Sequence, residues 1–158
     1  MILQKLKEAL DREGVPYEVL AHRPVFGAQE VAAAQHVPGR ELAKVVVARA
    51  GDRFLMAVLP APEKLDLEKL ERHLPEQRAQ LATEAEFRDL FPGCEVGAMP
   101  PFGNLFGLPV YVDKRLAQDP EIVFEAGNHE QTVRLAYADF ARMVRPEVDD
   151  FALTREDL

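Results

Sequence analysis

The chain has 158 residues, of which 47% are hydrophobic and 29% charged, and its 27 acidic and 19 basic side chains give a formal net charge of −8. This length suits one domain with a core of its own, and the apolar content excludes a disordered chain. The negative charge argues against a broad basic surface for binding DNA, and no apolar run is long enough to span a membrane. We therefore expect a soluble, cytoplasmic protein.

The composition also excludes several kinds of catalysis. The sequence contains no serine, so a serine hydrolase is excluded. Its single cysteine, Cys94, cannot form an internal disulfide or a CxxC pair, and no basic residue near it in sequence would activate its thiol. The four histidines lie far apart and form no HExxH pair: His22, His36, His73 and His129. We expect no metal and no cofactor.

The first half of the chain predicts two helices, a strand and a β-hairpin. Leu3, Leu6 and Leu10 share one face of an N-terminal helix that Gly14 and Pro16 end. A short strand and then an alanine-rich helix are expected over residues 17–20 and 27–36. Two valine-rich runs separated by a Gly-Asp turn predict a hairpin over residues 43–49 and 53–59.

The second half predicts short helices and more strands. A helix is expected from Asp66 to Pro75, and Thr83 begins a capping box ahead of another. Strands are expected over residues 110–113, 121–126 and 132–137, and Asp139 is expected to cap a last helix through Met143. Beyond Pro146 we expect an acidic, loose tail, which leaves residues 1–146 as one domain and 147–158 outside it. The fold class is mixed α/β with a largely antiparallel sheet.

Lys44 interrupts the apolar run from Ala43 to Ala48. A lysine flanked by valines in a strand has to reach water, an anion or a carboxylate, because a buried ammonium group is costly. The pattern alone favours the alternative of a lysine that protects the edge of a sheet from pairing with another chain.

The segment 97–109 is the second candidate, with three glycines and three prolines among large apolar residues. Glycines let backbone N–H groups approach a ligand closely, and such donors stabilise a carbonyl oxygen or oxyanion. The alternative is an apolar loop that only plugs the end of a barrel. The turn Gly127-Asn128-His129 is a third candidate, although an asparagine at a turn often serves the backbone conformation alone.

Several motifs in order make the chain resemble the YbaK/ProX family of aminoacyl-tRNA editing domains. After the first helix come His22-Arg23-Pro24 and then Ala-Lys-Val-Val-Val over residues 43–47. A GxxxP loop follows at residues 97–101, and the run Phe-Glu-Ala-Gly-Asn-His occupies residues 124–129. Tyr-Ala-Asp-Phe over residues 137–140 closes a resemblance that spans nearly the whole chain. The family is related to the editing insertion of bacterial prolyl-tRNA synthetases.

The resemblance implies a fold, an activity and a partner. The fold would be YbaK-like, with a largely antiparallel, barrel-like sheet and surrounding helices. The activity would be that of a free-standing deacylase, which hydrolyses the ester of mischarged tRNA in trans. The partner would be the acceptor end of aminoacyl-tRNA, with an aminoacyl-tRNA synthetase as a further partner.

The resemblance also implies a mechanism and a set of site residues. Lys44 would hold a phosphate, and the backbone at Gly97 would polarise the ester carbonyl. Water would attack with help from the free ribose hydroxyl of the substrate. The substrate-binding residues would be Lys44, Phe26, Gly97, Ala98, Met99, Pro101, Phe102, Gly127 and His129.

The chain departs from the family pattern at Pro100, where many relatives have a small polar residue. Pro100 lacks the side-chain hydroxyl that such a polar residue would supply. This loss concerns the choice of amino acid more than the fold. A rival interpretation is a non-catalytic module that binds the aminoacyl end of tRNA or a nucleotide-like ligand without hydrolysing it.

Overall fold

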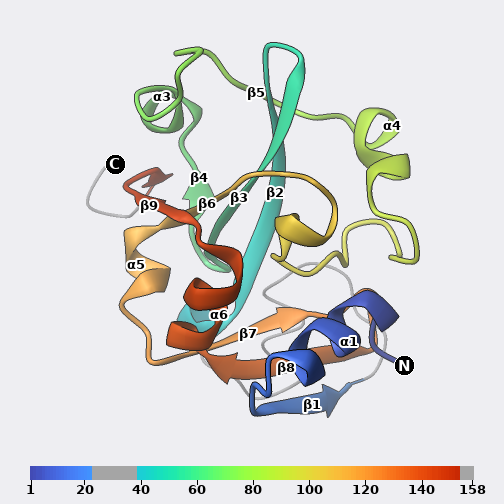
Figure 1. Ribbon diagram of the computed structural model, residues 1–158. Coiled ribbons are helices and arrows are strands. Elements are labelled where there is room, and N and C mark those ends of the chain that lie inside the picture. The colour runs from blue at the N-terminus through green and yellow to red at the C-terminus, as the bar shows by residue number, and fades with distance from the viewer. Residues whose placement is uncertain (23–38, 154–158) are drawn as a thin grey trace.

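The computed structural model describes residues 1–22 and 39–153, which form a mixed α/β fold (Figure 1). Within these ranges the strands make a five-stranded, a three-stranded and a two-stranded sheet. The hydrogen bonds between these strands do not join them into a closed barrel. The barrel-like sheet that the family resemblance implies therefore stays a prediction. The predicted helix over residues 27–36 and the predicted site residue Phe26 lie outside the described residues.

The N-terminal helix packs against the three-stranded sheet. Helix α1 (Gln4–Arg12) buries Leu6 and Leu10 against the core face of this sheet. The sheet is antiparallel with the order β1-β8-β7, from β1 (Tyr17–Ala21), β7 (Glu121–Glu125) and β8 (Gln131–Ala136). The β7–β8 hairpin therefore confirms the two strands predicted around the Gly127 turn, and it fixes that turn at the end of a sheet.

The five-stranded sheet has the order β5-β2-β3-β6-β9 and is mixed rather than wholly antiparallel. The predicted hairpin is confirmed, because β2 (Ala43–Ala50) and β3 (Arg53–Pro60) pair antiparallel along their full length. Strand β5 (Gln80–Leu81) pairs with the far end of β2. Strand β6 (Val110–Asp113) pairs in parallel with β3, and β9 (Glu147–Asp149) pairs in parallel with β6. Apolar residues on both faces of β3 are buried, so the core continues on either side of this sheet.

The remaining helices are short, and their starts follow local capping chemistry. Asp66 caps α3 (Leu67–Glu71), and Thr83 forms the predicted capping box with Glu86 on α4 (Glu84–Phe87). The 3₁₀ turns are η1 (Gly39–Glu41), η2 (Arg88–Leu90) and η3 (Gly103–Leu105). Two further helices are α5 (Lys114–Ala117) and α6 (Tyr137–Val144).

The prediction that Asp139 caps the last helix is wrong. Helix α6 begins at Tyr137, directly after strand β8, and its N-cap residue is Ala136, which makes no side-chain capping bond. The Tyr137 N–H instead donates to the carbonyl of Pro120, 3.0 Å away. Asp139 falls in the first helical turn, because a tertiary hydrogen bond satisfies the helix start that a side chain was expected to satisfy.

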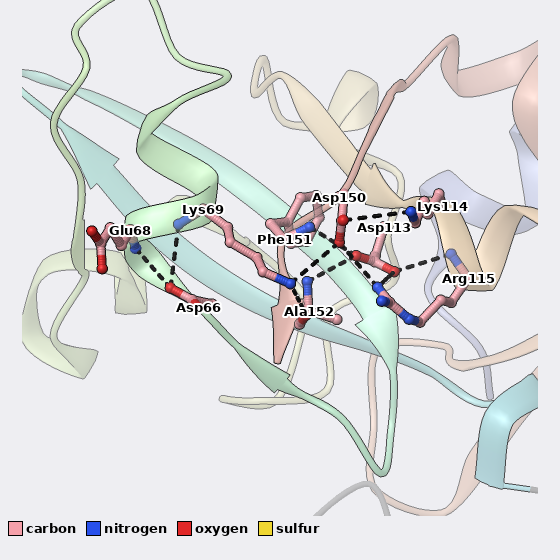
Figure 2. A network of polar contacts seen from close by, with 9 residues as sticks. All are labelled: Asp66, Glu68, Lys69, Asp113, Lys114, Arg115, Asp150, Phe151 and Ala152. Atoms are coloured by element: carbon pink, nitrogen blue, oxygen red, sulfur yellow. Dashed lines mark hydrogen bonds and ion pairs between the residues drawn. The ribbon is translucent and has the colours of Figure 1, made fainter. Parts of the chain in front are cut away.

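The expected loose tail is also corrected, for residues 147–153. Strand β9 joins the large sheet, and β10 (Ala152–Leu153) pairs with β4 (Lys64–Leu65). Phe151 is fully buried, and the buried Asp113 accepts hydrogen bonds from the N–H groups of Phe151 and Ala152, at 2.9 and 2.8 Å (Figure 2). The acidic composition of this segment gives no indication of the buried Phe151 or of the two strand pairings. No helix in the described ranges is long and apolar enough to cross a bilayer.

Candidate active site

The GxxxP loop and the β7–β8 turn, predicted from separate motifs, lie against each other. The Glu95 N–H donates to the Gly127 carbonyl at 2.8 Å, and the Gly127 N–H donates to the Ala98 carbonyl at 2.8 Å. Gly127 has a φ of +105°, and a Cβ there would lie 3.0 Å from Cβ of Leu3 on the N-terminal segment. Glycine is thus required at the turn both for its backbone conformation and for this close approach.

The His129 side chain adds a third link between turn and loop. His129 is 8% exposed, and its Nε2 lies 2.9 Å from the carbonyl oxygen of Val96. A carbonyl only accepts, so the ring carries a proton on Nε2 and donates it. The other ring nitrogen, Nδ1, lies 3.4 Å from Oε1 of Glu125. The imidazole therefore joins the last residue of β7 to the backbone beside Gly97.

Glu125 is a carboxyl group held in a desolvated position. Burial raises the pKa of Glu125 from its ordinary value to about 7. The neighbouring His129 lowers this pKa, whereas the negative charge of Glu95 raises it further. Neither Glu125 nor Val96 was predicted as a site residue. The sequence signal for Glu125 was its spacing from His129 across a glycine turn. Val96 takes part through its backbone carbonyl, so no feature of the sequence indicates its role.

Gly97 presents its backbone at the surface. It is exposed and has a φ of +85°, and a Cβ built there would lie 3.8 Å from Cε1 of His129. Among residues 1–22 and 39–153, the N–H groups of Gly97 and Met99 have no backbone hydrogen-bond acceptor, whereas that of Ala98 donates to Glu95. The loop thus offers backbone donors that its own fold does not use.

The other predicted residues of this loop are buried. Ala98, Met99, Pro101 and Phe102 all lie in the interior. The ring of Phe102 contacts those of Phe124 and Phe140, with centroids 5.4 Å away in each case. Phe102 therefore belongs to the core that supports the loop, and a direct contact with substrate stays a prediction for it.

Lys44 lies on a different element and makes a different contact. It is half-buried on β2, and its Nζ donates to the carbonyl of Glu63 in the turn after β3. Burial lowers its pKa, an effect that the Glu63 carboxylate opposes and the positive charge of Lys64 adds to. A parallel bridge from Leu42 to Val123 places the start of β2 beside β7. This bridge links the lysine strand to the hairpin that carries Glu125.

The remaining groups that could take part in catalysis are Cys94 and side chains able to bind a metal ion. Cys94 is a free thiol whose pKa is raised to about 11 by burial, so at neutral pH it is not a thiolate. In the described part of the chain, no group of three His, Cys, Asp or Glu residues could hold a metal ion.

Comparisons with known proteins show the family and the fold of this chain. The model of a family described as the aminoacyl-tRNA editing domain matches residues 22–143. The chain is 32% identical to the multifunctional Ser/Thr-tRNA deacylase ProXp-y of Escherichia coli K12, over 96% of this chain and 93% of that protein. It is 35% identical to proline–tRNA ligase of Thermosipho africanus, over 48% of this chain and 13% of the ligase. The fold matches that of a candidate trans-editing enzyme for prolyl-tRNA synthetase, with a TM-score of 0.81, 23% identity, and coverage of 96% and 97% of the two chains.

Proposed function

Because the chain belongs to the aminoacyl-tRNA editing domain family, we propose that it acts as a free-standing deacylase that hydrolyses the ester of mischarged tRNA in trans. The bond that breaks joins the carbonyl carbon of the amino acid to a ribose oxygen of the terminal adenosine. Water supplies the new oxygen on the amino acid, and the ribose regains its hydroxyl. Coverage of almost the whole E. coli deacylase supports an enzyme that acts without being fused to a synthetase.

The observation that carries this proposal is the exposed backbone of Gly97. Its N–H has no backbone acceptor within the described residues, and two backbone hydrogen bonds and the His129 contact fix the loop around it. Donors that are already oriented stabilise the negative charge that develops on an ester oxygen during attack, without any reorganisation. The loop therefore binds the ester carbonyl, and the attacking water is assisted by the neighbouring ribose hydroxyl.

Lys44 is assigned to a phosphate at the acceptor end. The burial that lowers its pKa also favours exchange of the Glu63 carbonyl for a fully charged partner, because charge-assisted hydrogen bonds are stronger than those to neutral acceptors. One cation at a single phosphate is compatible with a chain of net charge −8.

The substrate is a small aminoacyl group. The name of the E. coli relative specifies Ser- and Thr-tRNA, and an apolar pocket separates neighbours that differ by one methylene by only about 1–3 kcal/mol. We expect the protein to accept several small aminoacyl groups and to reject bulky ones. A synthetase partner stays a prediction.

The test is single-turnover deacylation of a panel of tRNAs carrying small and bulky amino acids, with hydrolysis in buffer alone as the background. Hydrolysis of seryl-, threonyl- or alanyl-tRNA well above background is the expected result. Binding of these tRNAs without hydrolysis would instead establish the non-catalytic module. Repeating the active case with a terminal deoxyadenosine, which lacks the assisting hydroxyl, should leave binding intact and slow the reaction strongly.

A further inference from the structure

We propose that Glu125 and His129 are positioning residues that hold the Gly97 loop in its working conformation through one shared proton. The inference rests on the proposed deacylase function, since the loop is where we place the ester. It concerns residues that act through the backbone of the loop rather than on the substrate.

The geometry links the three groups in a line. Oε1 of Glu125 lies 3.4 Å from Nδ1 of His129, and Nε2 of the same ring lies 2.9 Å from the Val96 carbonyl. Val96 immediately precedes Gly97, whose φ of +85° sets the direction of the N–H that we assign to the ester. A rotation of the imidazole would therefore release the loop at the residue next to its functional donor.

The link requires one proton between the carboxyl group and the ring. Nε2 must carry a proton to donate to Val96, and this leaves Nδ1 with either a lone pair or a second proton. A proton between Nδ1 and Oε1, on either atom, makes that contact attractive. Without it, a nitrogen lone pair faces a carboxylate and the contact repels.

The environment of Glu125 places loss of this proton near neutral pH. Burial raises the pKa of Glu125 to about 7, and the charged groups that act on it among the described residues are His129 and Glu95. A rise in pH through this value removes the proton and weakens the link. We therefore expect kcat/KM for deacylation to fall at alkaline pH because the protein loses this proton.

Glu125→Gln tests this, because the amide side chain donates to Nδ1 at every pH. We expect kcat/KM of the variant to lie within about threefold of the wild type at pH 6.5. Between pH 6.5 and pH 8.5 the ratio of variant to wild type should rise about 25-fold, because the protonated fraction of a group with a pKa of about 7 falls from roughly three quarters to about 3% over this range. The ratio of variant to wild type removes the effect of hydroxide on the ester itself, because that effect is the same for both enzymes. Glu121→Gln, an exposed change on the same strand, is the matched control and should give a constant ratio near one.

A constant ratio for Glu125→Gln in an active enzyme would overturn the inference while leaving the deacylase function intact. An inactive wild type would count against the proposed function instead. Should the variant not fold, nitrogen NMR of His129 in the wild type decides: we expect a proton on Nε2, donated to the Val96 carbonyl. A ring protonated on Nδ1 alone would contradict the link to Val96.

Discussion

At the scale of single residues, Lys44 is a half-buried cation in an apolar strand, and the proposed function requires it to be available for binding a phosphate. Its ammonium group donates one hydrogen bond to the Glu63 carbonyl. This partner is neutral and can be exchanged for an anion. In the stretch around Lys44, β2 is paired with β3 but not with β5, which reaches only Ala48 and Arg49. Near Lys44, the side of β2 that faces away from β3 is not paired with β5. The edge-protecting role is therefore also compatible with the structure.

Lys44→Ala separates the two roles. If the ammonium binds a phosphate, its loss should cost about 1.5–3 kcal/mol of transition-state binding, or roughly 10- to 150-fold in kcat/KM. Thermal stability should stay nearly unchanged, since the alanine also removes the cost of burying a charge. Lys7→Ala is the control, because Lys7 is exposed and pairs with Asp11 one helical turn away. Normal deacylation together with increased aggregation would show that Lys44 protects the sheet edge.

At the scale of elements, the site depends on a loop being fixed by a hairpin turn far from it in sequence. Gly97→Val should abolish activity, because a β-branched side chain would fill the space in which the backbone meets the ester. It also forces a positive φ on valine, which costs about 1–2 kcal/mol of stability. Gly107→Val controls for this strain: Gly107 has a φ of +72°, and nothing in the described part of the chain lies within 4 Å of where its Cβ would stand. Measured by deacylation and thermal unfolding, both variants should lose similar stability, and only the first should lose activity.

At the scale of the whole molecule, one buried carboxylate ties the C-terminal segment to β6, the strand next to the edge of the five-stranded sheet. Asp113 accepts from the N–H groups of Phe151 and Ala152, and also pairs with Arg115 at 3.3 Å (Figure 2). Asp150 in turn contacts Lys69, Lys114 and Arg115. Strand β9 thereby forms one edge of the five-stranded sheet, and Phe151 packs in the same core cluster as Leu55 and Leu59 of β3.

Asp113→Asn should destabilise the fold by about 2–4 kcal/mol, because an amide presents a donor where the carboxylate met only donors. Denaturant unfolding measures the loss, and hydrogen exchange at Phe151 and Ala152 should accelerate first. Asp52→Asn in the β2–β3 turn is the exposed control and should change stability by less than about 0.5 kcal/mol. Equal stability of the two variants would show that strand pairing alone holds the C-terminal segment.

The sequence by itself determined the features whose partners are close along the chain. The β2–β3 hairpin follows from two valine-rich runs around a two-residue turn, and the start of α4 follows from the Thr83–Glu86 capping box. The order of Lys44, the GxxxP loop and the Gly127 turn was enough to identify the family, because those residue types recur at fitting separations. These signals are local or ordered in sequence, so they can be read without knowing how the chain packs.

Only the tertiary structure decided how distant segments meet. The parallel pairing of β6 with β3 and of β9 with β6 has no local signature, and the buried Phe151 looks like one apolar residue in an acidic tail. The start of α6 depends on a hydrogen bond to Pro120 rather than on Asp139. Most of all, the contact from His129 to Val96 spans 33 residues and ends on a backbone carbonyl. A backbone atom has the same chemistry in every residue, so only the folded arrangement reveals that the imidazole of the turn supports the loop.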